Sequence, residues 1–126
     1  MSELHPDTST SLASSHLLEA VNSFNSEKWY LAHDLFEELW HQSSGDFREL
    51  LQAIIQISVA EYHLENGNTR GAILLMAEGL NHLLATASLR VGYDLVFLRD
   101  LVRERLSALQ NQKDPSALPK PYLNSI

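Results

Sequence analysis

The chain has 126 residues, 44% of them hydrophobic and none of them cysteine; this is enough for one hydrophobic core, and it excludes disulfides and thiolate metal sites. Its 16 acidic against nine basic residues give a formal net charge of −7, which repels phosphate backbones and argues against nucleic-acid binding. No apolar run approaches the roughly 20 residues that span a bilayer, so we expect a cytoplasmic domain without a membrane partner.

The first third of the chain predicts two helices after a leader. Residues 1–13 are rich in Ser and Thr and have no apolar periodicity, so we expect them to be a flexible leader. Apolar residues then recur at helical spacing over residues 14–24. A second helix is expected to begin after a cap at Asn25 or Ser26 and to run to about Gln42.

The third helix follows after a short loop. Asp46 and Glu49 have the spacing of a capping box, which predicts a helix start there. The helix is expected to run to Asn66 and to stop at Gly67. Because the loop is short, the second and third helices are predicted to be antiparallel neighbours.

Two more helices are expected in the second half. Asn68 or Thr69 can cap a fourth helix that fades near Ser88. Its two glycines, Gly71 and Gly79, lie on nearly the same face, which suggests that another backbone approaches there. After a break at Val91-Gly92, a fifth helix is marked by Leu95, Leu98, Val102, Leu106 and Leu109.

The end of the chain predicts a non-helical tail. Three prolines within residues 113–126 prevent helix continuation, so this segment is expected to be extended or disordered. No useful β-type alternation appears. The predicted fold is therefore all-α: a single compact bundle of about five helices over residues 14–112, with a central antiparallel helix hairpin.

Polar residues interrupt the apolar faces of the two central helices. His33 and Glu37 are an i, i+4 pair on the second helix, where a carboxylate can orient an imidazole. Gln52, Gln56 and His63 fall within about 40° of one another on the third helix, whose other faces are mostly apolar. We therefore expect these five residues to form one polar cluster between the two helices.

Three interpretations of this cluster are open. The stripe could simply face water, as the polar side of any amphipathic helix does. The five residues could instead form a hydrogen-bonded network that fixes the packing of the two helices. They could also flank a small polar pocket or bind a metal ion.

The metal hypothesis concerns His33, Glu37 and His63. Two imidazoles and one carboxylate match the facial-triad ligand set of Fe(II) and also suit Zn²⁺. The sequence contains neither His-Glu-x-x-His nor the paired Glu-x-x-His of di-iron bundles. No cofactor is expected apart from such a divalent ion.

An ordered set of short motifs runs through the same region: Phe24-Asn25, Tyr30, Ala32-His33, Glu37, Trp40, Gln52, Ile55-Gln56, Ala60, His63, Gly67-Asn68 and Gly71-Ala72. In this combination the chain resembles the small helical proteins classed as domain of unknown function 309. The resemblance covers about Phe24 to Leu84. Asp34 and Ala53 stand where that family usually has Glu and Gly. The resemblance implies an all-helical fold and supplies no established activity.

The favoured function is a small non-enzymatic binding or adaptor module, which could be a homo-oligomer. The alternative is a metal-dependent or acid–base enzyme that acts on a small polar substrate through His33, Glu37 and His63. The two classes differ in whether the cluster forms an open site for a substrate.

Overall fold

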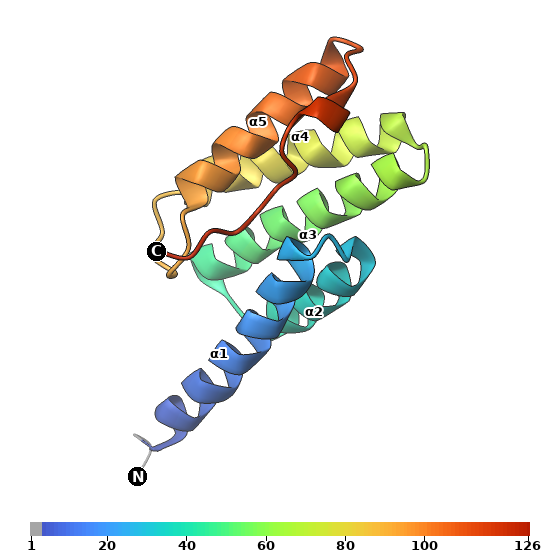
Figure 1. Ribbon diagram of the computed structural model, residues 1–126. Coiled ribbons are helices and arrows are strands. Elements are labelled where there is room, and N and C mark those ends of the chain that lie inside the picture. The colour runs from blue at the N-terminus through green and yellow to red at the C-terminus, as the bar shows by residue number, and fades with distance from the viewer. Residues whose placement is uncertain (1–3) are drawn as a thin grey trace.

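The computed structural model describes the backbone of residues 4–126 and the side chains from residue 15 onward. Within that part the fold is all-α, as predicted, and contains no strand. None of the described helices is long and apolar enough to cross a membrane. The elements are α1 (Leu4–Asn25), α2 (Trp29–His41), α3 (Gly45–Glu65), α4 (Thr69–Thr86), α5 (Leu95–Gln110) and the short 3₁₀ helix η1 (Pro115–Ala117) (Figure 1).

Helix α1 begins well before the expected start at Ser14. It begins at Leu4, so much of the segment expected to be a flexible leader, residues 1–13, is helical. Residues 1–3 lie outside the described part. Pro6 is compatible with this start because it falls in the first helical turn, where backbone N–H groups have no helical acceptor in any case.

Two of the expected helix caps are wrong. Helix α2 is preceded by Lys28 and has no side-chain cap. Neither expected residue caps it, because Asn25 is still the last residue of α1 and Ser26 lies in the turn before Lys28. Helix α3 begins at Gly45, so Asp46 lies in the first turn rather than at the cap. A carboxylate in that turn still favours the helix through its interaction with the helix dipole.

The caps of the later helices follow the expected chemistry. The Asn68 side chain accepts a hydrogen bond of 3.0 Å from the Gly71 amide and so caps α4, as predicted. The Asp94 side chain accepts one of 2.9 Å from the Phe97 amide and caps α5. Gly67 has a φ of 77°, which allows the tight turn between α3 and α4.

Helix α3 lies in the middle of the bundle, between α2 and α4 (Figure 1). It packs against both, and most extensively against α4. The expected α2–α3 pair is therefore present, but the closest pair is α3–α4. At the α1–α2 corner, the Phe24 ring meets Trp29 and Phe36 edge to face, with ring centroids 5.2 and 6.2 Å apart. This geometry suits aromatic rings in a core.

The C-terminal segment, residues 113–126, is extended apart from η1 and packs along the bundle (Figure 1). Its residue Leu123 is buried, and its backbone N–H and C=O both bond to the Asn25 side chain of α1. The segment also pairs with the loop before α5, where the Asp94 amide donates to the Asn124 carbonyl and the Ile126 amide donates to Gly92. These contacts connect the end of the chain to α1 and to the start of α5.

The close approach of α4 to α3 is centred on Gly79, which is buried. A Cβ atom at this position would lie 3.1 Å from the Ala53 carbonyl oxygen and 3.0 Å from Cγ1 of Ile57. The carbonyl belongs to the backbone of α3 and can move only if the whole helix shifts. This close contact between α3 and α4 explains why position 79, one of the two glycine positions on this face of the helix, carries no side chain.

We predict that Gly79→Ala lowers the free energy of unfolding. The steric cost of about 1–3 kcal/mol should exceed the gain of about 1 kcal/mol in helix propensity. Urea unfolding measures the difference, and the pair Asn81→Gly and Asn81→Ala, at an exposed position inside the same helix, reports the propensity effect alone. A Gly79→Ala variant more stable than the parent would show that α3 and α4 are not in such close contact.

Candidate functional site

His33 and His63 line the same groove, which lies between α2 and α3. Its volume is about 240 Å³, and its other lining residues are Trp29, Tyr30, Val59 and Tyr62. Trp29 is buried, whereas Tyr30 and Tyr62 are 61% and 38% exposed. The structure therefore brings together the two histidines that the sequence singled out, within a mainly aromatic wall.

The position of Trp29 is fixed by α3 as well as by the core. Its indole Nε1 donates a hydrogen bond of 3.1 Å to Oε2 of Glu65. A buried indole N–H needs such an acceptor. The bond connects the first turn of α2 to the last turn of α3, at one side of the groove.

His33 contacts two carboxylates of its own helix. Its Nδ1 lies 3.1 Å from Oδ1 of Asp34, and its Nε2 lies 3.8 Å from Oε2 of Glu37. The i, i+4 contact with Glu37 was predicted, and Asp34 adds a shorter one. His63 contacts the start of α4 instead, where its Nδ1 lies 3.4 Å from Nδ2 of Asn68.

The two glutamines do not join this groove. Gln56 donates a hydrogen bond of 3.0 Å from Nε2 to Oε1 of Glu78, so it lies at the α3–α4 contact. Its Oε1 is buried and has no hydrogen-bond partner among the residues that the structure describes. Gln52 is half-buried, and its side chain makes no hydrogen bond within the described part of the chain. The polar residues of α3 thus lie along the edge where this helix meets both α2 and α4. The expected cluster is therefore divided, because Gln56 bonds to α4 whereas His63 lines the groove with His33.

The geometry gives no support to the metal hypothesis. Among the described residues, which include His33, Glu37 and His63, no group of three or more His, Cys, Asp or Glu side chains is arranged to hold a metal ion. Asp34 and Glu37 contact the same imidazole at different nitrogens.

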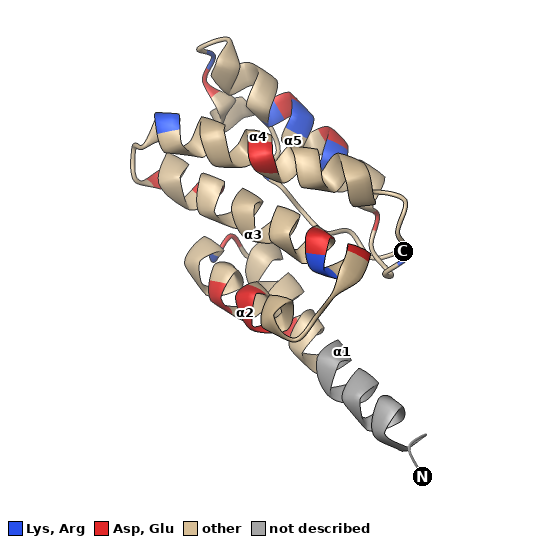
Figure 2. Ribbon diagram, turned by 180° about the vertical axis from the view of Figure 1, so that it is seen from behind, with Lys and Arg blue, Asp and Glu red and all other residues tan. Residues whose placement is uncertain are grey.

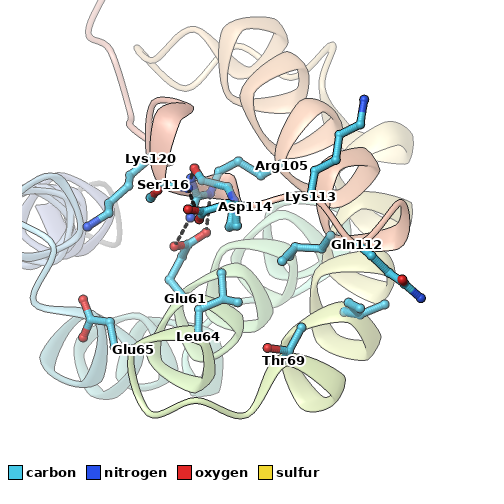
Figure 3. A pocket seen from close by; sticks show the side chains of 13 residues that line it. Glu61, Leu64, Glu65, Thr69, Arg105, Gln112, Lys113, Asp114, Ser116 and Lys120 are labelled. Carbon is cyan, nitrogen blue, oxygen red and sulfur yellow. Dashed lines mark hydrogen bonds and ion pairs between the residues drawn. The ribbon is translucent and has the colours of Figure 1, made fainter.

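A second, larger hollow of about 700 Å³ lies between the end of α3, the start of α4 and the segment after α5 (Figure 3). An ion pair between Glu61 and Arg105 lies in its wall, and each residue is only 2% exposed. The Arg105 guanidinium donates from Nε and Nη2 to the two carboxylate oxygens, at 2.7 Å each. This bidentate geometry is the strongest form of the interaction.

The same guanidinium also holds the C-terminal segment. Its Nη1 donates to the backbone carbonyls of Pro115, Leu118 and Pro119 at 3.3–3.4 Å. Burial raises the pKa of the Glu61 carboxyl, and the hydrogen bonds and charge of Arg105 oppose that rise. One side chain of α5 thus joins α3 to the tail.

Sequence reasoning missed Tyr62 and Arg105. Arg105 falls in the apolar stripe of α5, beside Val102 and Leu106, and Glu61 interrupts the apolar arc of α3 in the same way. One acid and one base on two otherwise apolar faces are the signal that could have paired them. For Tyr62 the sequence signal is weaker, because a single tyrosine on a mostly apolar helix is as compatible with the core as with a binding surface.

A family model described as Domain of unknown function (DUF309) matches residues 17–75. This match confirms the resemblance drawn from the sequence motifs. It covers every residue that lines the groove between α2 and α3, and it ends before Arg105 and the tail. Among curated proteins, no match to this chain was found.

We predict that Arg105→Met destabilises the protein by about 3–5 kcal/mol at pH 8, because Glu61 is left as a buried charge without a partner. The loss of stability caused by Arg105→Met should be smaller at pH 5. A carboxyl whose pKa is higher in the folded than in the unfolded protein favours folding while it is protonated. This contribution to stability is fully present below its ordinary pKa of 4.5 and is lost as the pH rises through the raised folded-state pKa. Urea unfolding at both pH values measures this difference.

Two further variants complete the test. Glu61→Met combined with Arg105→Met should be more stable at pH 8 than Arg105→Met alone, because no unpaired charge remains. Arg103→Met, at an exposed position of the same helix, is the matched control. A deficit for Arg105→Met that is independent of pH, or no larger than that of the control, would contradict the prediction.

Proposed function

We propose that this protein is a non-enzymatic binding module whose groove between α2 and α3 receives one side chain of a partner protein. The observation that carries this proposal is the groove itself. Six residues from two helices line a hollow of about 240 Å³, and exposed Tyr30 and Tyr62 lie among them. Exposed aromatic side chains beside a groove are typical of binding surfaces.

The size of the groove supports a side chain as its occupant. Sites for whole small molecules have volumes of roughly 300–1,000 Å³, and this groove is smaller. Catalysis through His33, Glu37 and His63 would need a polar site for the substrate, whereas the groove has a mainly aromatic wall. Binding is therefore the function that the geometry favours.

The class of partner follows from charge and composition. A net charge of −7 opposes binding to nucleic acid, which supports a protein as the partner. The absence of cysteine suits a reducing compartment, and we place this interaction in the cytoplasm.

We predict that peptides selected from a random display library on the full-length protein will depend on the groove. They should bind the parent protein and lose at least about tenfold in affinity on Tyr62→Ala, because an aromatic anchor contact is worth more than about 1.4 kcal/mol. Fluorescence polarisation with the labelled peptides gives the affinities.

The matched control is Tyr122→Ala, which removes a tyrosine of similar exposure (44%) from the C-terminal segment. Peptide affinity should be unchanged in this variant. If the library yields no peptide whose binding depends on Tyr62, the groove is not a binding site and the proposed function is wrong.

A further inference from the structure

We infer that the side chain received by the groove is cationic, an arginine or lysine within a basic segment of the partner. This inference rests on the proposed function and specifies its ligand. It combines two observations that are independent of each other: the aromatic rings that line the groove, and the carboxylates beside it.

The rings form a continuous series across the α2–α3 contact. The centroids of Tyr30 and Tyr62 are 5.4 Å apart, those of Tyr30 and His33 are 5.8 Å apart, and those of Tyr62 and His63 are 6.4 Å apart. Neighbouring rings are inclined by 36–53°, so they do not stack flat on one another. The face of an aromatic ring carries negative partial charge and attracts a cation within about 6 Å.

The charges beside the groove have the matching sign. Helix α2 carries Asp34, Glu37 and Glu38 and contains no Lys or Arg, and its ribbon is red without blue in Figure 2. Two of these carboxylates contact His33 in the groove wall. On α3, Glu65 contacts Trp29. The nearest basic residue in sequence is Lys28, which is exposed just before α2.

These features discriminate among the possible occupants. An anionic side chain would meet ring faces and carboxylates of the same sign, which is unfavourable. An apolar side chain would gain from the aromatic wall alone. A cation gains from the wall and from the carboxylates, and it remains partly hydrated because the groove is open at the surface. A basic partner segment would also approach the acidic protein faster through long-range attraction.

The test compares two ligands of nearly the same shape. N-acetyl-arginine amide and N-acetyl-citrulline amide differ mainly in the charge of the terminal group. In NMR titrations of the full-length ¹⁵N-labelled protein at low salt, both are expected to shift the signals of Tyr30, Val59, Tyr62 and His63. The arginine derivative should bind about tenfold more tightly.

Charge variants test the role of the carboxylates. Glu37→Gln should lower the affinity for the arginine derivative about twofold to threefold and leave that for the citrulline derivative unchanged. Glu104→Gln makes the same change in net charge at an exposed position on α5, and it should leave both affinities unchanged. Equal losses in these two variants would mean that net charge attracts the ligand rather than the groove.

The outcomes separate this inference from the proposed function. If citrulline or leucine derivatives bind the groove as tightly as arginine does, the occupant is not a cation, while the binding function stands. If no derivative shifts the groove signals and no library peptide depends on Tyr62, the proposed function fails. If light scattering shows a dimer that Tyr62→Ala dissociates, a second copy of this chain occupies the groove and the inference is overturned.

Discussion

The arrangement of the bundle depends on the buried ion pair between Glu61 and Arg105. Two charges with about 2% exposure are costly to bury, and they are tolerated because their geometry is bidentate and the third guanidinium nitrogen bonds to backbone carbonyls. A buried pair of this kind requires a specific arrangement of the helices that carry it. Here it fixes α3 relative to α5, and it fastens the segment that returns to α1 through Leu123.

This constraint also positions the groove. Consecutive residues of an α-helix point about 100° apart, so holding Glu61 against α5 turns its neighbours Tyr62 and His63 away from that contact. The adjacent turn places Glu65 against Trp29 of α2. Glu61, which does not line the groove, therefore sets the rotation of the helix that supplies half of the groove wall. The binding surface and the core are two faces of the same helix.

The helices and the two histidines could be predicted from the sequence, but the partners of several residues could not. Apolar periodicity shows which face of a helix is buried, and it located all five helices. It does not show which neighbouring helix covers an edge, so Gln56 of α3 is expected to face α2, whereas it bonds to Glu78 of α4. Glu61 and Arg105 are 44 residues apart, and only the packed bundle brings them together. The helical start of α1 at Leu4 had no apolar pattern to indicate it.

Hydrogen exchange of single backbone amides tests most directly whether this ion pair fastens the tail to the bundle. The amides of Leu123 and Ile126 donate to Asn25 and Gly92, so they should be protected in the parent protein. In Arg105→Met they should exchange much faster, by more than the general loss of stability accounts for, while amides at the α3–α4 contact change only in line with that loss. Equal changes at the tail and at the α3–α4 contact would contradict the account.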